Sequence, residues 1–286
     1  MSSRQQYRHL ERLRIRWAEV DMQSIVFNGH YLMYFDTAVA GWWRAMALPY
    51  TQTMQYLGGD LYVRKATLEY NASAHYDDLV DVGVRTQRIG NSSMVIACGV
   101  FRGDELLVSG ELVYVYADPA TQTSRPVPQQ LRDLLEAFDA GKPMVEVRTG
   151  AWDELGREAG AIRSQVFVDE QKIPAEMEWD AADAVAVHAV AYNRLGVPLA
   201  TGRLLEHVPG VAKIGRMAVL RPMRGTRIGR AVLDALMAAA RARGDREVLL
   251  HAQTSAAPFY QRAGFSARGP QFDEAGIPHV EMVRLL

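Results

Sequence analysis

A cluster of chain-breaking residues, Ala140-Gly141-Lys142-Pro143, divides the sequence near its middle. Glycine and proline interrupt helices and strands, and a chain of 286 residues is long for a single hydrophobic core. The patterns on the two sides of the cluster differ, and inspection finds no repeat that relates them. We therefore predict two unlike domains, residues 1–142 and 143–286, in a protein of the α+β class.

The first half has the pattern of a long buried helix followed by an antiparallel sheet. Apolar residues from Tyr31 to Trp42 recur at helical spacing, which predicts a helix with one buried face. Alternating residues at 13–17 predict a strand before this helix. Turn signals separate four further strand-like segments, at 61–70, 79–89, 93–101 and 105–116, and a short helix is expected at 129–138.

The second half predicts a mixed α/β domain with a different plan. Helices are expected at 152–167, 226–243 and 256–263, and strands at 184–192, 198–206, 212–220, 247–252 and 279–285. Strands that alternate with helices in this way are typical of a sheet covered by helices.

Composition narrows the classes of function. Lys and Arg number 32 against 33 Asp and Glu, so no net charge would draw the whole chain to nucleic acid or to an anionic membrane. Nucleic-acid binding is therefore a poor third hypothesis, and any anion site must be local. The N-terminal residues lack a signal-peptide core, and no stretch approaches the ~20 apolar residues of a membrane helix. We expect a cytoplasmic protein.

Cysteine and histidine give no sign of a metal site. The single cysteine, Cys98, lies in an apolar run, so we expect a buried structural thiol and no disulfide. The seven histidines include no pair at the spacing of metal ligands on a helix. We predict that the protein binds no metal.

The stretch 17–31 carries the strongest signal of the first half. It resembles the active-site motif of the 4-hydroxybenzoyl-CoA thioesterase-like hotdog proteins, through Asp21, Val26 and Tyr31. The resemblance covers residues 10–135 and implies a hotdog fold, an antiparallel sheet wrapped round a long helix. It also implies a catalytic carboxylate at Asp21 and active sites built between subunits, hence a homo-oligomer, either a dimer or a tetramer. Ser24 stands where the family often has glycine.

The chemistry of a thioester accounts for this placement. Hydrolysis needs a nucleophile or general base beside the carbonyl carbon and a hydrogen-bond donor for the oxygen, which becomes negative. Asp21 supplies the first group. Unpaired N–H groups at the start of the long helix supply the second, and the resemblance assigns this role to the backbone of Asn28. The alternative for an aspartate at a strand exit is that it only caps a turn.

In the second half, a strand, a basic glycine-containing loop and an amphipathic helix follow one another over residues 214–233. Backbone N–H groups at a helix start, with nearby arginines, form a site for a pyrophosphate. The loop resembles the acetyl-CoA loop of GNAT acetyltransferases, with Arg227 in the place of the middle glycine. The cofactor-binding residues that we predict are Met217, Val219, Arg224, Gly225, Thr226, Arg227, Ile228, Gly229, Arg230 and Gln253.

A second stretch, 249–265, also resembles the GNAT family and extends the likeness over residues 145–286. The resemblance implies that Tyr260 protonates the departing thiolate of CoA; a tyrosine packed in the core is the alternative. The general base stays open among Glu170, Glu176, Asp180, His188 and His251. The acidic stretch 176–180 would suit a cationic acceptor amine, although a solvated loop is the simpler interpretation.

These observations favour a bifunctional enzyme with acetyl-CoA or another acyl-CoA as the common ligand. One half would hydrolyse an acyl-CoA thioester, and the other would transfer an acetyl group from acetyl-CoA to an amine. In the alternative, the hotdog domain is a non-catalytic CoA-binding or oligomerisation module of an acetyltransferase. The identity of the acceptor and the preferred acyl group do not follow from the sequence.

Overall fold

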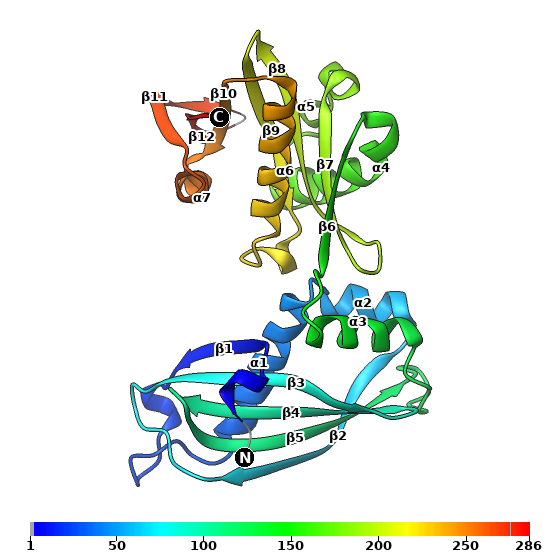
Figure 1. The fold of residues 1–286 in the computed structure, drawn as a ribbon, viewed down its shortest axis with the longest axis vertical. Helices are drawn as coiled ribbons and strands as arrows, with labels where there is room; N and C mark the ends of the chain where they lie inside the picture. The colour runs from blue at the N-terminus through cyan, green and yellow to red at the C-terminus, as the bar shows by residue number, and fades with distance from the viewer. Residues whose placement is uncertain (1–2, 275) are drawn as a thin grey trace. The chain divides into compact units, whose positions relative to one another are not determined.

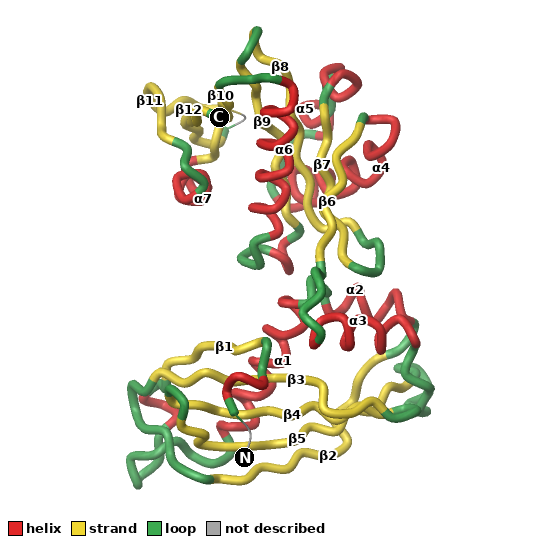
Figure 2. The backbone as a smooth tube through the Cα atoms, in the orientation of Figure 1, coloured by secondary structure: helices red, strands yellow, loops and turns green. Residues whose placement is uncertain are grey.

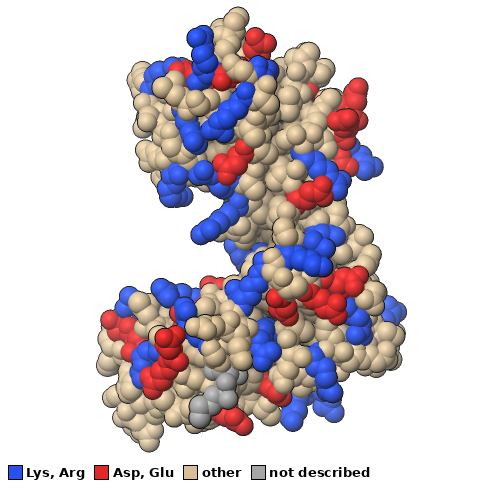
Figure 3. All heavy atoms as spheres, viewed as in Figure 1, with Lys and Arg blue, Asp and Glu red and all other residues tan. Residues whose placement is uncertain are grey.

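A computed structural model of the protein describes residues 3–274 and 276–286. The chain divides into two compact units, Met1–Met144 (unit 1) and Val145–Leu286 (unit 2), and each is described here by itself (Figure 1). In the face of each unit that Figure 3 shows, basic and acidic side chains are intermingled. Within the described residues, no helix combines the length and the apolar character needed to cross a membrane.

Unit 1 consists of an antiparallel sheet and a long helix. The sheet has the order β1-β3-β4-β5-β2, and all its neighbouring strands are antiparallel. Its strands are β1 (His9–Arg14), β2 (Asp60–Tyr70), β3 (Leu79–Ile89), β4 (Ser93–Arg102) and β5 (Glu105–Ala117). The long helix α1 (His30–Ala45) packs against β1, β3 and β4, and the shorter helices are α2 (Tyr50–Leu57) and α3 (Gln129–Asp139) (Figure 2). This is the hotdog arrangement that the resemblance implies.

The apolar face of α1 explains its position. All six residues that carry the helical period, from Tyr31 to Trp42, are buried, together with Trp43. Burying large side chains of this kind contributes roughly 1.5–3 kcal/mol each. A Cβ atom on Gly110 of β5 would lie 2.5 Å from the ring of Phe35, so glycine permits the close approach of helix and sheet. The predicted buried helix is thus confirmed.

Unit 2 has one mixed sheet, with the strand order β11-β12-β10-β9-β8-β7-β6. Its strands are β6 (Val145–Gly150), β7 (Val187–Asn193), β8 (Pro198–Val208), β9 (Val211–Val219), β10 (Glu247–Gln253), β11 (Ser266–Glu274) and β12 (Ile277–Leu285). Strands β9 and β10 run parallel, and the other neighbouring pairs are antiparallel. The helices are α4 (Trp152–Arg163), α5 (Ala175–Glu178), α6 (Ile228–Arg243) and α7 (Ala257–Arg262).

Strand β8 shows how the helices cover this sheet. A Cβ atom on Gly202 would meet Val232 and Leu236 of α6, whereas the next residue, Arg203, reaches Asp183, the partner of Arg163 in α4. Successive side chains of a strand point to opposite faces. Helices α4 and α6 therefore lie on opposite faces of the sheet.

The parallel strands β9 and β10 separate part of the way along. Their pairing ends at Ile214 and Leu250, although both strands continue beyond these residues. At the same point, the β8–β9 register shifts, and Arg216 has a left-handed backbone with φ of 52°. A shift of this kind is a β-bulge, which bends a strand away from its neighbour. The gap between β9 and β10 is where the pockets of unit 2 lie.

Several sequence-based boundaries are corrected. The strand expected at 13–17 begins and ends earlier, as β1, and Trp17 lies in a 3₁₀ turn instead. The helix expected at 152–167 ends as an α-helix at Arg163 and continues as a π-helical turn, Ser164–Glu170. The helix expected from residue 226 begins at Ile228. The sequence did not predict α2, β6 or β11.

Candidate functional sites

Asp21 lies at the start of a tight loop between Val20 and Val26, which form an isolated antiparallel bridge. Its backbone N–H donates to the carbonyl of Ile25 at 2.9 Å, and its Oδ1 accepts from the backbone N–H of Gln23 at 2.8 Å. The loop also forces Ser24 into a left-handed conformation, with φ of 62°. This conformation explains why glycine suits the position of Ser24 in similar sequences.

The Asp21 carboxylate therefore has two different oxygens. Oδ1 closes the turn, whereas no hydrogen bond in the described residues uses Oδ2. The side chain is half-buried. The turn-capping role and a chemical role are thus compatible, because one oxygen fixes the carboxylate and the other can contact a substrate or a water molecule.

Asn28 lies just before helix α1, which begins at His30. Asn28 is exposed, and its carbonyl oxygen accepts a hydrogen bond from the Tyr70 hydroxyl at 3.3 Å. Across residues 3–274 and 276–286, the backbone N–H of Asn28 donates to no acceptor of the protein. It is therefore available to a carbonyl oxygen of a ligand, with the positive end of the helix dipole behind it.

Beneath the loop lies a buried carboxylate that sequence reasoning missed. Glu19 accepts hydrogen bonds from the Tyr34 hydroxyl at 2.9 Å and from the Arg16 backbone at 2.7 Å. Burial acts to raise the pKa of Glu19, but the hydrogen bonds from Arg16 and Tyr34 outweigh it and hold the pKa below its usual value. Because the Glu19 carbonyl also accepts from the Phe27 N–H, this ionised group anchors the loop to α1.

Large apolar side chains are exposed around the Asp21 loop. Met22 is 103% exposed and Trp17 is 75% exposed, and the Trp17 ring packs edge-on against the exposed Tyr76 ring, with 5.6 Å between their centroids. Exposed apolar groups that gather in one place mark an interaction surface rather than a solvated one.

In unit 2, a pocket of about 860 Å³ lies where β9 and β10 separate. Eight of the ten predicted cofactor-binding residues line it: Met217, Val219, Arg224, Gly225, Arg227, Gly229, Arg230 and Gln253. The other two support the loop. Ile228 is buried, and the Thr226 hydroxyl donates to the Met223 carbonyl at 2.6 Å.

The loop before α6 has the backbone of an anion cradle. Gly225 and Arg227 both have positive φ, of 84° and 67°, and Arg227 is the N-cap of α6. A Cβ atom on Gly229 would lie 3.0 Å from the Val219 side chain, so glycine lets the helix start close to β9. The first turn of a helix leaves its N–H groups unpaired, and Gly229 and Arg230 of this turn line the pocket, as phosphate binding requires.

The three arginines of this loop have different partners. Arg224 forms a bidentate ion pair with Glu170, at 2.6 and 2.7 Å. Arg230 pairs with Asp234 one helical turn further on, at 2.8 Å. Arg227 has no ion pair or side-chain hydrogen bond in the part of the chain that the structure describes. The guanidinium of Arg227 can thus bind an anion directly, whereas Arg224 must first break its ion pair with Glu170.

Tyr260 of α7 lies between two pockets. It lines the cradle pocket and also an adjoining pocket of about 420 Å³, and the two pockets share Gln171, Met217 and Gln253. Burial raises the pKa of Tyr260 to about 12, so its hydroxyl is protonated at neutral pH. A protonated hydroxyl at the junction of two pockets can donate a proton to a leaving group placed there.

The structure separates the five candidates for the general base. Glu170 is occupied by Arg224, and His188 is buried with its Nε2 donating to the Asp183 carbonyl at 2.9 Å. Burial lowers the pKa of His188, so its imidazole is neutral. Asp180 and His251 line the smaller pocket, whereas Glu176 is not among its lining residues.

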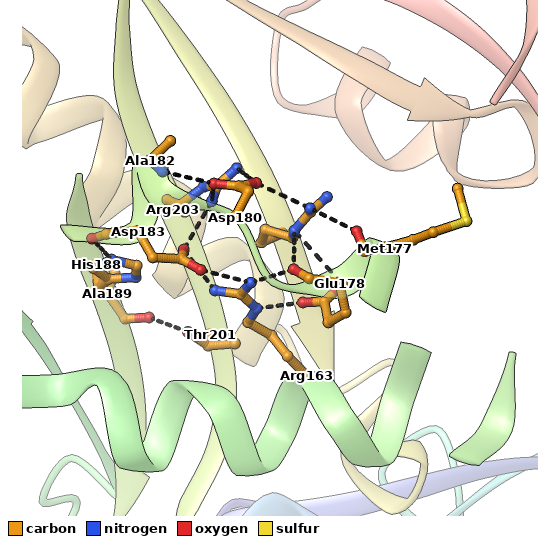
Figure 4. A network of polar contacts seen from close by, with 11 residues as sticks. Arg163, Met177, Glu178, Asp180, Ala182, Asp183, His188, Ala189, Thr201 and Arg203 are labelled. Carbon is orange, nitrogen blue, oxygen red and sulfur yellow. Dashed lines mark hydrogen bonds and ion pairs between the residues drawn. The ribbon is translucent and has the colours of Figure 1, made fainter. Parts of the chain in front are cut away.

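The acidic stretch 176–180 belongs to a charge network, which Figure 4 shows. Glu178 and Asp183 both pair with the buried Arg163 of α4, and Asp183 also accepts from Arg203 at 2.7 Å. Asp180 pairs with Arg203 and with Arg216, at 2.8 and 3.1 Å. Three arginines thus offset the carboxylates of Glu178, Asp180 and Asp183, whereas Glu176 is exposed and forms no ion pair within the described residues. Part of the stretch lines the smaller pocket, so it is not simply a solvated loop.

Two family models match the chain. The thioesterase superfamily matches residues 23–109, and the acetyltransferase (GNAT) domain matches residues 157–286. The uncharacterized N-acetyltransferase YjcF of Bacillus subtilis (strain 168) is 35% identical over 133 residues, which are 46% of this chain and 94% of that protein. The uncharacterized protein YyaT of the same organism is 35% identical over 130 residues, 44% of this chain and 86% of its own.

Among solved structures, Slr0204, a 1,4-dihydroxy-2-naphthoyl-CoA thioesterase from Synechocystis, is 17% identical with a TM-score of 0.42. The match covers 46% of this chain and 97% of that chain. The fold and the family matches define a protein with two domains from families that use CoA thioesters. The chain belongs to the GNAT acetyltransferases through unit 2, and its unit 1 is a hotdog domain of the thioesterase superfamily.

Proposed function

We propose that the protein is a bifunctional acyl-CoA-utilising enzyme, with residues 1–142 and 143–286 as its two functional domains. The first hydrolyses an acyl-CoA thioester, and the second transfers the acetyl group of acetyl-CoA to an amine. The observation that carries the proposal is that unit 1 fixes the Asp21 carboxylate in the loop that leads to α1, and that Tyr260 of unit 2 lines the same pocket as the first turn of α6.

In the hydrolysis, the Asp21 Oδ2 attacks the thioester carbonyl carbon or removes a proton from the attacking water. The N–H of Asn28 then donates to the carbonyl oxygen as it becomes negative, which stabilises the transition state. Water supplies the atoms that replace the C–S bond, so the products are a carboxylate and CoA thiol. Asp21 keeps its geometry through this step because its Oδ1 is tied to Gln23.

In the acetyl transfer, the first turn of α6 and Arg227 bind the CoA pyrophosphate. The pantetheine arm extends along the gap between β9 and β10, beside Met217 and Val219. The thioester then lies near Tyr260, whose hydroxyl protonates the leaving sulfur. The adjoining smaller pocket receives the amine.

We also propose that unit 1 assembles into a homo-oligomer, a dimer or a tetramer. The exposed Trp17, Met22 and Tyr76 surround the Asp21 loop, and a second copy that covered them would exclude water from the thioester. Strand β2 is also an edge strand, with most of its residues exposed. The buried reduced thiol of Cys98 suits a cytoplasmic location.

One observation favours the alternative, in which unit 1 is only a CoA-binding or oligomerisation module. Asp21 already caps its own turn through Oδ1, which is a sufficient structural reason for an aspartate there. The two readings differ in what happens to a thioester.

The test is hydrolysis of a panel of acyl-CoA thioesters, from acetyl to long-chain and aromatic, followed by thiol release. Asp21→Asn keeps the size and the turn-capping oxygen but removes the charge. We expect at least a 100-fold loss of hydrolysis, as for removal of a catalytic acid–base group. Asp104→Asn, in the exposed turn between β4 and β5, is the matched control and should hydrolyse like the wild type. Equal rates for all three proteins, or no cleavage by any, would favour the module.

A further inference from the structure

His251 occupies the point of strand β10 at which the parallel pairing with β9 has just ended at Leu250. It lies on the same face of the strand as Gln253, two residues further on, and both line the smaller pocket that also contains Tyr260. The imidazole is half-buried. The strand thus places His251 within the pocket that is proposed to receive the amine.

Two carboxylates flank the imidazole. The distance from Nδ1 to the Glu274 Oε2 is 3.4 Å, and that from Nε2 to the Glu281 Oε2 is 3.8 Å. His251 and Glu281 are direct partners in the register of β10 and β12, so the sheet itself fixes their approach. The edge of the Phe272 ring packs against the imidazole, with 4.9 Å between centroids, and limits its rotation.

Glu281 is a fixed partner rather than a mobile one. Its Oε1 accepts from Arg268 at 2.6 Å, and Arg268 also pairs with Glu247 at 2.9 Å. The pKa of Glu281 is lowered, chiefly by the hydrogen bond from Arg268, so Glu281 is ionised at neutral pH. A carboxylate held in this way can orient an imidazole, as the third group of a catalytic triad does.

Other charged groups near His251 come from every neighbouring strand. They are Glu274 and Arg268 on β11, Glu281 and His279 on β12, Lys213 on β9, and His207 on β8, which acts on Glu281. Of these, Glu274 is both exposed and part of the pocket wall, so it can attract the ammonium of an approaching acceptor.

We propose that His251 is the general base of the acetyl transfer, and that Glu281 is its positioning residue. This inference rests on the proposed acetyltransferase function of unit 2. Asp180, the other base candidate that lines the pocket, is paired with two arginines, whereas both ion-pair partners of His251 are carboxylates. Imidazole is also the side chain whose proton exchange best suits neutral pH.

The acceptor enters as an ammonium and gives one proton to His251, which later releases it to solvent. The free amine forms a bond to the acetyl carbon, and the C–S bond breaks as the intermediate collapses. Tyr260 protonates the leaving sulfur and recovers a proton from the amide nitrogen through solvent. The products are an N-acetylated amine, CoA thiol and one proton.

The experiment measures transfer from acetyl-CoA to spermidine, glucosamine and 2-phenylethylamine, three amines that differ in charge, shape and basicity. Mass spectrometry quantifies the N-acetylated product, so that thioester hydrolysis by unit 1 does not contribute. The comparison is among wild type, His251→Asn, Glu281→Gln and Glu206→Gln, an exposed glutamate of β8 outside both pockets. Calorimetric binding of CoA shows that each variant is folded.

We expect His251→Asn to lower kcat/KM at neutral pH about 100-fold or more and to leave CoA binding unchanged. In the wild type, kcat/KM should fall towards acidic pH, and the pH at which it reaches half of its maximum should be the same for every amine. In His251→Asn this half-maximal pH should rise with the basicity of the amine, since the amine must then lose its proton in solution. Glu281→Gln should lower kcat and leave the KM for acetyl-CoA unchanged, because the imidazole then lacks the carboxylate that orients it. Glu206→Gln should leave kcat and the pH profile unchanged.

Three other outcomes would each contradict a different part of the proposal. If the wild type acetylates none of the three amines, the proposed acetyl transfer fails, and the role of His251 fails with it. If transfer occurs but the pH profile of kcat/KM for His251→Asn is that of the wild type, only the assignment of the base is wrong. If His251→Asn does not fold, an unchanged kcat in Glu281→Gln overturns the proposal by itself.

Discussion

The guanidinium of Arg224 and the carboxylate of Glu170 form a bidentate ion pair, with N–O distances of 2.6 and 2.7 Å. Arg224 belongs to the loop before α6, and Glu170 is the last residue of the π-helical turn that follows α4. The pair reaches across 54 positions of the sequence. Glu170 thus occupies the anion position of an arginine that is predicted to bind the phosphates of CoA.

Removing this competing carboxylate should tighten CoA binding. The pair is partly exposed, with 42% and 35% of the two side chains accessible, so it contributes at most about 1 kcal/mol of free energy. Glu170→Gln should therefore bind CoA roughly two- to fivefold more tightly in a calorimetric titration. Glu146→Gln removes a carboxylate from an exposed pair on β6 and serves as the control. Weaker binding by Glu170→Gln would show that Glu170 supports the loop instead.

Arg227 should show opposite effects on stability and on binding. Its left-handed φ of 67° costs an L-residue about 1–2 kcal/mol, and glycine is free of this cost. Arg227→Gly should be about 1 kcal/mol more stable than Arg227→Ala in urea unfolding, because both lose the same charge and differ at the backbone. Both variants should bind CoA several-fold more weakly than the wild type. Equal stabilities of the two variants would contradict backbone strain at Arg227. A CoA affinity equal to that of the wild type would contradict the role of the guanidinium.

Asp183 should be essential to the stability of unit 2. Burial acts to raise its pKa, but the hydrogen bonds from Arg163 and Arg203 outweigh it and keep the pKa below its usual value. Its stabilising effect is therefore complete above the unfolded pKa of about 3.9 and is lost as the pH falls through the lower folded value.

Asp183→Asn leaves two buried guanidinium groups without this partner, and should cost about 3–5 kcal/mol in the free energy of unfolding. Acid should also destabilise the wild type below about pH 4. Asp234→Asn, which breaks an exposed pair on α6, should cost less than about 1 kcal/mol. A similar small loss for both variants would show that the network of Figure 4 has little effect on stability.

Cys98 should not react in the native protein. The side chain is buried in β4, as the sequence predicted, and burial raises the pKa of its thiol to about 12. The thiol is thus protonated at pH 8, where a disulfide reagent attacks thiolates. Labelling should begin only when urea unfolds unit 1, and should then reach one thiol per chain. Rapid labelling of the native protein would contradict the burial.

Periodicity and turn residues predicted most of the fold. The pairs Gly90-Asn91 and Gly103-Asp104 mark the turns of the β3–β4–β5 meander, so these strands were placed to within about one residue. The missed strand β11 is exposed along its whole length and contains Gly269 and Pro270, so it has no alternation to detect. Strand β6, at the opposite edge of the sheet, begins two residues after the breaker cluster that was expected to form the domain boundary.

In the candidate sites, too, the sequence predicted what depends on local motifs and missed what depends on contacts between distant segments. The positions of Asp21, Asn28 and Tyr260 came from short motifs, which fix a residue relative to its own helix or strand. The capture of Arg224 by Glu170 and of Glu178 by Arg163 depends on contacts between distant segments. No local pattern reports such contacts, so the acidic stretch 176–180 was interpreted as a solvated loop or as an amine site.

The most direct test of two independent chemistries is a crossed measurement on Asp21→Asn and Tyr260→Phe. Each protein is assayed for acyl-CoA hydrolysis, through the free carboxylate, and for acetyl transfer, through the N-acetylated amine. We predict that Asp21→Asn loses hydrolysis and keeps transfer, and that Tyr260→Phe loses transfer by about 100-fold or more and keeps hydrolysis. If one substitution removes both activities while both variants remain folded, or neither substitution removes any, the account of two separate acyl-CoA sites is wrong.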